Sequence, residues 1–333
     1  MKAKEYRRIV EQNIKTAAGR QQEQQLELNM QSNVLSQALE TQSALLNESD
    51  AQMIEGLVKD KSAHQDIRAA AVARLGFGDD ARVDLEQLID MLNDPDEAPE
   101  VKLQAIMKLE AASFERIDFV ELRPQYFAVL RSCLDSRDED LLLTVLDVLS
   151  SNKDPHVQET LLGWLNNPAE CPISLAIVLQ LLGNDIHSGI YAAAKKVLND
   201  TSDEEVRIEA MRLLASDGDS QAYFKSVLLD QKESVDVRRL AASACKSLAP
   251  DQFREDALSI IEDENENDSL RATALTGLAH SPEFLADDTL RQSVQTVCDN
   301  SASEYITVMA DKHLTRTEKQ KMNQSYYYEE PTE

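Results

Sequence analysis

A short sequence pattern recurs along most of this chain, and it constrains the fold more than any other feature. Each copy has an acidic or amide turn residue, followed in the regular copies seven or eight residues later by a base, as in Asp94 to Lys102. The copies begin at Asp60, Asp94, Asp135, Asn167, Asp200, Asp230, Asp263 and Asp299. Their spacing of 30 to 41 residues is typical of proteins that stack one small supersecondary unit many times.

Each repeat is predicted to form two helices. The second is clearest, for example at 67–75 and 206–214, where apolar residues recur every three or four positions. One such hairpin cannot bury its apolar surface alone, whereas a stack of hairpins can. The chain holds only 9 Gly and 9 Pro in 333 residues, too few for the turns of an all-β protein. We therefore predict an all-α protein, an α-solenoid of about eight helical hairpins over residues 51–314.

The run Asp94 to Lys102, together with the Val-Arg and Leu-Arg copies, resembles HEAT repeats. The short, alanine-rich units are most similar to the bacterial HEAT-like type that is also found in phycobilisome lyases. The resemblance covers roughly residues 51–314 and implies a right-handed solenoid. It also implies that turn aspartates and helix bases form stacked ladders of charge. By this resemblance the following bases are structural: Arg68, Lys102, Arg207, Arg238 and Arg271.

The N-terminal residues 1–50 lie outside the repeat and are rich in Gln. Six apolar residues between 21 and 46 lie at near-heptad intervals: Leu28, Leu35, Ala38, Leu39, Leu45 and Leu46. This spacing predicts a helical extension with a narrow apolar seam. The extension is predicted to cap the first repeat, and self-association through residues 21–46 or docking of a partner helix are the alternatives.

The C-terminal residues 315–333 also lose the period. They end in three tyrosines, Tyr326 to Tyr328, followed by a mostly acidic segment. We predict a disordered acidic tail there. A linear docking motif built on the tyrosines is the alternative.

The charge of the chain restricts its partners. Sixty acids against 34 bases give a formal charge of −26, which argues against binding to nucleic acid or to anionic membranes. A basic protein partner would account for the excess of acids. The longest apolar stretch, Ile173 to Leu182, is too short to span a bilayer, and the N-terminus does not resemble a secretory signal. Four widely separated cysteines are predicted to be reduced thiols, and we expect a cytoplasmic protein.

The middle of the chain departs from the repeat. Leu142 and Ser174 stand where the ladder base is expected, and the helices that follow are apolar around most of their circumference. Helical spacing places six residues on two comparable stripes: Leu142, Val145, Leu149, Leu175, Val178 and Leu182. These residues are either core or an apolar strip on the inner surface that binds a partner.

Several chemistries are not supported by the sequence. None of the five histidines is followed by Glu, so the ligand pairs of HEAT-repeat di-iron hydroxylases are absent, and no cofactor is predicted. No phosphate-binding glycine motif or local nucleophile motif occurs. We therefore predict a non-catalytic scaffold or adaptor that binds a basic or amphipathic protein on its concave surface. By resemblance, the alternative is a lyase, an isomerase or a chaperone for a tetrapyrrole–protein adduct, with Asp154, His156 and Trp164 around the chromophore.

Overall fold

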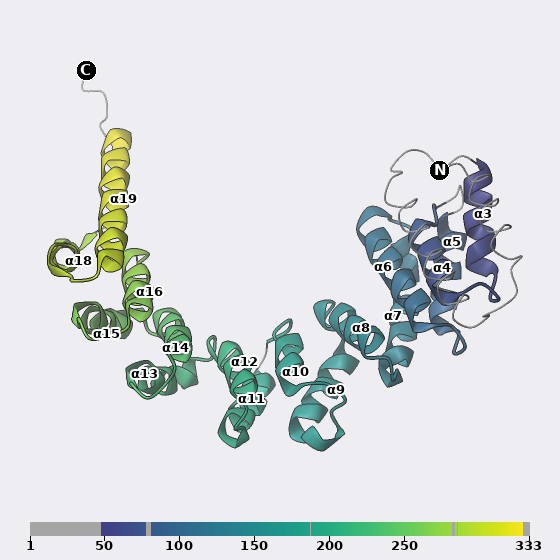
Figure 1. Ribbon diagram of the computed structural model, residues 1–333, viewed down its shortest axis with the longest axis horizontal. Helices are drawn as coiled ribbons and strands as arrows, with labels where there is room; N and C mark the ends of the chain where they lie inside the picture. Colours follow the sequence, from purple (N-terminus) through teal and green to yellow (C-terminus); the bar gives the residue numbers. More distant parts are fainter. Residues whose placement is uncertain (1–47, 78–80, 187, 282–283, 285, 329–333) are drawn as a thin grey trace, which may run out of the picture. The chain divides into compact units, whose positions relative to one another are not determined.

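The structure is a computed structural model that describes residues 48–77, 81–186, 188–281, 284 and 286–328 (Figure 1). Within these ranges all regular secondary structure is helical and no strand occurs. The chain divides into two compact units, residues 1–157 and 158–333. The division falls inside helix α9 (Pro155–Asn166).

Unit 1 contains three successive helical hairpins. They are α3 (Glu48–Lys59) with α4 (Gln65–Arg74), α5 (Ala81–Asn93) with α6 (Pro99–Glu115), and α7 (Phe119–Ser132) with α8 (Glu139–Ser151). A 3-10 turn (Cys133–Asp135) follows α7. The second helices pack on one another in the order α4, α6, α8, and α5 packs on α7.

Unit 2 continues with the same hairpin pattern. After most of α9 come a 3-10 turn (Pro168–Glu170), α10 (Leu175–Leu182), and α11 (Ser188–Asp200) with α12 (Glu204–Leu214). A 3-10 turn (Gly218–Ser220) leads into α13 (Gln221–Leu229), which pairs with α14 (Val235–Leu248). The last two hairpins are α15 (Pro250–Glu262) with α16 (Asp268–Ala279), and α18 (Asp288–Asn300) with α19 (Glu304–Tyr328). Here α10, α12, α14, α16 and α19 stack in sequence.

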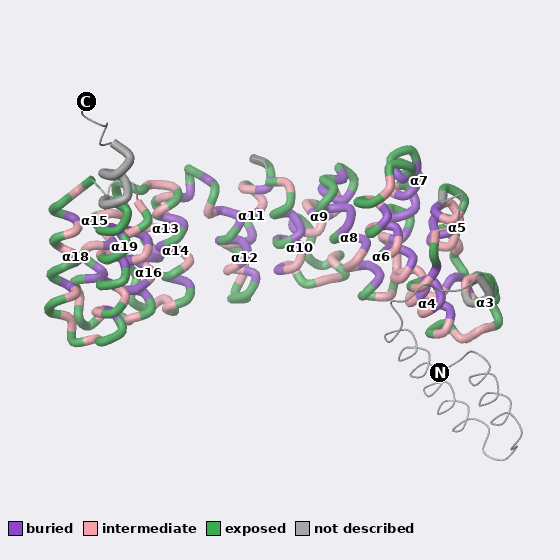
Figure 2. Tube along the Cα trace, turned by 90° about the horizontal axis from the view of Figure 1, so that it is seen from above, coloured by how far each residue is buried: buried purple, intermediate pink, exposed green. Residues whose placement is uncertain are grey.

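Within each unit, the helices bury apolar side chains against their neighbours. Figure 2 shows buried and exposed residues alternating along most helices of unit 2, as a stack of amphipathic helices requires. The second helices carry buried alanines at their contacts, for example Ala241 and Ala244 of α14 and Ala274 of α16. Small side chains let successive second helices approach one another closely.

The recurring turn residues shape the connections within hairpins. The carboxylates of Asp60, Asp94, Asp230 and Asp263 each accept a hydrogen bond from the backbone N–H two residues ahead, at 2.9–3.0 Å. Such turns leave the second helix to begin at a separate cap a few residues later. Ser234 caps α14 and Asn267 caps α16 in this way.

The prediction of an all-α solenoid is confirmed, and the eight expected repeats correspond to eight successive hairpins among the described helices. The prediction of a disordered tail over residues 315–333 does not hold for residues 315–328, because α19 continues to Tyr328, and residues 329–333 lie outside the described part of the chain. Buried His313 and Thr317 still pack in this segment, and the residues after them are mostly good helix formers. The predicted N-terminal extension lies outside the described residues, apart from its last three, which begin α3. None of the helices that the structure describes has the length and apolar content needed to cross a membrane.

Candidate functional site

Three of the five predicted ladder bases make paired contacts with the next hairpin. Arg207 donates to Glu233 at 2.5 and 2.8 Å, and Arg238 donates to Glu266 at 2.6 and 2.9 Å. Arg68 forms the equivalent two-point contact with Glu97. In all three pairs the acid lies three residues after the turn aspartate of the following repeat. The planar guanidinium matches a carboxylate at two points, which fixes the register of one hairpin on the next.

Three of the ladder arginines also bind their own hairpin. Arg68, Arg238 and Arg271 donate to the backbone carbonyls of Val58, Leu228 and Ile261, each of which is ten residues earlier. Each carbonyl lies one residue before the end of the first helix, where helical carbonyls lack an intrahelical partner. Arg68 and Arg238 therefore join both helices of their hairpin to the next turn.

The expectation that turn aspartates pair with the ladder bases names the wrong acid. The turn aspartates bind backbone N–H groups, and the glutamate three residues later carries the ion pair. The signal was present in the sequence, because Glu97, Glu233 and Glu266 stand at one fixed position of the repeat. Lys102 is the exception: it has no ion-pair partner within the described part of the chain, and the residue at that position of the next turn, Asp138, caps α8.

The ion pairs shift the acidities of their carboxylates. The hydrogen bond from Arg207 holds the pKa of Glu233 below its usual value. Burial alone would raise the pKa of Glu266, but hydrogen bonds from Arg238 and from the Asn267 amide outweigh it and lower the pKa. Both acids are thus held ionised by the contacts that join the hairpins.

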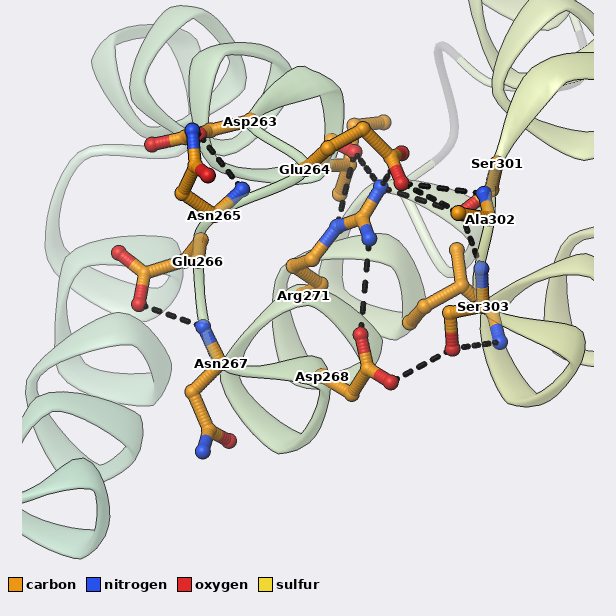
Figure 3. A network of polar contacts seen from close by, with 12 residues as sticks. Asp263, Glu264, Asn265, Glu266, Asn267, Asp268, Arg271, Ser301, Ala302 and Ser303 are labelled. Atoms are coloured by element: carbon orange, nitrogen blue, oxygen red, sulfur yellow. Dashed lines mark hydrogen bonds and ion pairs between the residues drawn. The ribbon is translucent and has the colours of Figure 1, made fainter.

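The last ladder position is built differently (Figure 3). The next turn has Ala302 where the partner acid is expected, so Arg271 pairs instead with Glu264 of its own turn. Glu264 in turn accepts a hydrogen bond from the Ala302 amide at 3.1 Å. Asp268 accepts one from the Ser303 hydroxyl at 2.6 Å. The connection to the final hairpin is preserved, but its acid, Glu264, belongs to the same hairpin as Arg271 and not to the next one.

A second series of ion pairs joins first helices to the following hairpin and was not predicted. Each pair joins a base of one first helix to an acid at or near the next: Arg131 to Asp154, Lys195 to Asp217, Lys225 to Asp256, and Arg254 to Asp287. Three of these acids, Asp154, Asp217 and Asp287, also accept hydrogen bonds from backbone amides where the next segment begins. The bases occupy no fixed position in the repeat, so spacing alone did not reveal them.

The predicted apolar strip is core. Leu142, Val145, Leu149, Val178 and Leu182 are all buried, and Leu175 is half-buried. The wide apolar surface of α8 and α10 is therefore covered within the fold, and the hypothesis that these residues form a free binding surface is wrong. Helical spacing correctly grouped them on stripes but could not tell which stripe faces a neighbouring helix.

The residues suggested for a chromophore do not form a free site. Both oxygens of the Asp154 carboxylate bind Arg131, and one of them also accepts from the backbone of His156 and Val157. Trp164 is half-buried in α9. Among the described residues, no three His, Cys, Asp or Glu side chains are grouped so that they could hold a metal ion.

Unit 2 contains a groove of about 500 Å³ on the face formed by its second helices. We call this the second-helix groove; α14, α16 and α19 form it, and Phe253 of α15 contributes from beneath. Gly277 of α16 leaves room for the Phe253 ring, because a Cβ at Gly277 would lie 2.7 Å from that ring. Tyr305 and Met309 line the α19 side.

The second-helix groove differs from the rest of the chain in charge. Two bases, Arg239 and Lys246, are among its 13 lining residues, and none of the 13 is acidic. The chain as a whole has almost two acids for each base. Arg239 donates to the Thr273 hydroxyl at 3.0 Å and pairs with Asp236 at 3.4 Å, so it is held across α14 and α16.

Comparisons with known proteins do not assign this chain to a family. It matches no protein-family model and no curated protein. Two similar solved structures are human deoxyhypusine hydroxylase in complex with glycerol and Legionella pneumophila aminopeptidase A in complex with aspartic acid, each 13% identical. The first aligns over 71% of this chain and 96% of its own, with a TM-score of 0.33. The second aligns over 86% of this chain and 36% of its own, with a TM-score of 0.41.

Proposed function

We propose that this protein is a non-catalytic scaffold of the HEAT-repeat type, acting in the cytoplasm, that binds an extended segment of a protein partner. The binding site in this proposal is the second-helix groove of unit 2. The observation that carries it is the composition of the groove: apolar, hydroxyl and basic side chains on three adjacent helices, with no acid in a strongly acidic chain.

The hydrogen-bonding groups of the groove suit a peptide backbone. Four hydroxyls, those of Ser243, Ser247, Thr273 and Thr276, donate to the carbonyl four residues earlier in their own helix. The oxygen lone pairs of Ser243, Ser247 and Thr276 are then directed to accept, as the N–H groups of an extended chain require, whereas the Thr273 hydroxyl already accepts from Arg239. Arg239 and Lys246 supply donors for carbonyl or carboxylate groups.

The apolar residues and the bases together define the partner. Tyr305 and Met309 offer a surface for an apolar side chain, and Lys246 offers a positive charge beside it. The overall charge of the chain predicts a basic partner, whereas this groove suits an amphipathic segment that carries an acidic residue. Complementary charge at the groove would fix the register of the bound segment.

A peptide array tests the proposal. Immobilised peptides of about 12 residues, varied in charge and in apolar content, would be probed with the purified full-length protein and with Lys246→Glu. The wild type should prefer peptides that place an acid beside an aromatic or aliphatic residue. Charge reversal at Lys246 should weaken these peptides about tenfold and favour basic ones.

Lys232→Glu is the matched control, because it makes the same charge change at an exposed position in the α13–α14 turn, away from the groove. It should leave the peptide preference unchanged. Equal effects of the two substitutions, or no preference in the wild type, would contradict the proposed groove.

A further inference from the structure

The connection between α6 and α7 carries the most exposed large apolar side chains that the structure describes. Phe114 is 87% exposed and Ile117 85%, while Met107 and Val120 are each 61% exposed. Met107 and Phe114 are two helical turns apart and so lie on one face of α6. We call these four residues the α6–α7 corner. A soluble surface rarely leaves such a group uncovered.

Helix α3, which follows the N-terminal segment in the sequence, begins near this corner. The first turns of α3 and the end of α4 share a small pocket lined by Ala51, Ile54 and Phe77. The Phe77 ring lies 5.4 Å from the Arg116 guanidinium and 5.5 Å from the Lys108 Nζ atom. Arg116 is the residue directly between α6 and Ile117. The start of α3 is therefore linked through one phenylalanine ring to the end of α6.

The 47 residues that precede α3 contain the segment with complementary character. Residues 21–46 carry the near-heptad apolar seam, with Leu35 and Leu39 one helical turn apart. If helical, these 26 residues would be about 39 Å long, several times the spacing of about 10 Å between packed helices. The segment is thus long enough to pass over the end of α4 and reach α6.

From these observations we infer that residues 21–46 of this chain dock on the α6–α7 corner of the same molecule. The apolar seam covers Phe114, Ile117 and their neighbours and shields them from water. This site differs from the second-helix groove and does not depend on it. It also differs from a cap on the first hairpin, where Ile54 and Leu57 are half-buried and Met53 is 48% exposed, less than any residue of the α6–α7 corner.

Hydrogen exchange followed by mass spectrometry on the full-length protein tests this contact from both sides. Leu39→Glu places a charge in the seam, and amides of residues 111–120 should then exchange about tenfold faster. Phe114→Ser should in turn speed exchange within residues 21–46. Gln37→Glu, which adds the same charge off the seam, and Val308→Ser, at an exposed apolar position of α19, are the matched controls.

Three results would overturn the inference. Residues 111–120 could exchange equally fast in Leu39→Glu and Gln37→Glu. Leu39→Glu could instead expose α3 alone, which would place the segment on the first hairpin. Finally, sedimentation at two protein concentrations could show a dimer that Leu39→Glu dissociates, which would make a second copy the occupant.

Discussion

The ladder position of the second helices is filled by charged side chains in one part of the molecule and by uncharged side chains in another. In α14 and α16 the ladder position holds Arg238 and Arg271, which are buried and bind carbonyl and carboxylate oxygens. In α8 the same position holds Leu142, which is buried among apolar side chains. In α10 it holds Ser174, which caps the helix through the Ala176 amide.

The difference shows what the ladder position requires. It faces the end of the first helix and the next turn, so a base there needs both a free carbonyl and a nearby acid. Apolar packing is not directional and tolerates a neighbour without an acid. A buried ion pair is directional and specifies register, and breaking it is costly because the remaining charge has no partner.

The largest effect is expected from a charge in the apolar part. Val178→Asp in unit 2 buries a carboxylate without a partner, and we expect a loss of stability of about 4 kcal/mol, enough to unfold the surrounding hairpins. Fluorescence of Trp164, the only tryptophan and a residue of unit 2, would follow the transition. Leu142→Asp should do the same to unit 1, followed by circular dichroism.

Gln180→Asp is the control for this experiment, because it adds the same side chain at an exposed position of α10. It should change the melting temperature only slightly. An unfolding transition of Val178→Asp at the wild-type midpoint would mean that this face of α10 is open to solvent. It would contradict the view that apolar packing replaces the ion pair in this hairpin.

A smaller effect is expected from the charged part, and its size should follow burial. Arg238→Ala removes the base that pairs with Glu266, whose side chain is only 9% exposed, and that donates to the Leu228 carbonyl, so it should cost about 3 kcal/mol. Arg207→Ala removes a pair whose side chains are about a quarter exposed and should cost about 1 kcal/mol. Denaturant titrations of both variants, followed through Trp164, measure the difference.

The double variant Arg238→Met with Glu266→Leu sharpens this result. It removes both charges and keeps most of the volume, so it should recover much of the stability that Arg238→Ala loses. Equal losses of stability in Arg207→Ala and Arg238→Ala would show that burial does not determine how much an arginine–glutamate pair contributes to stability.

Much of the fold follows from the sequence, because turn residues, bases and apolar periodicity recur together. The number of hairpins was predicted in this way. The structural role of the ladder bases was implied by the resemblance to HEAT repeats, and among the five it is Lys102 that has no ion-pair partner in the described part of the chain. The partner acids required knowledge of which residue of the next turn lies opposite the guanidinium. The role of Leu142 and Val178 required knowledge of which helix face a neighbour covers.

The second-helix groove and the α6–α7 corner could not be found from the sequence for the same reason. Arg239, Lys246, Tyr305 and Met309 come from two helices more than 50 residues apart in the chain. Nothing in their local patterns indicates that they share one surface. Phe114 and Phe119 look alike in the sequence, yet Phe114 is exposed and Phe119 is buried.

The smallest effect concerns acidity and separates the charged part from the apolar part most directly. The pKa of Glu266 is lowered in the folded protein, so its contribution to stability is present above the unfolded pKa of about 4.3 and is lost as the pH falls through the lowered value. Glu266→Gln should therefore destabilise unit 2 at pH 7, and the difference from wild type should shrink as the wild-type carboxylate becomes protonated, since a protonated Glu resembles Gln. Val178→Asp should converge only in part, because protonating its carboxylate removes the buried charge but still leaves a buried polar group in place of valine. Denaturant titrations from pH 7 to pH 3, with exposed Glu262→Gln as a pH-independent control, measure these differences. A difference for Glu266→Gln that stays constant with pH would mean that its ionised carboxylate does not stabilise the hairpin contact, despite the two hydrogen bonds that it accepts from Arg238.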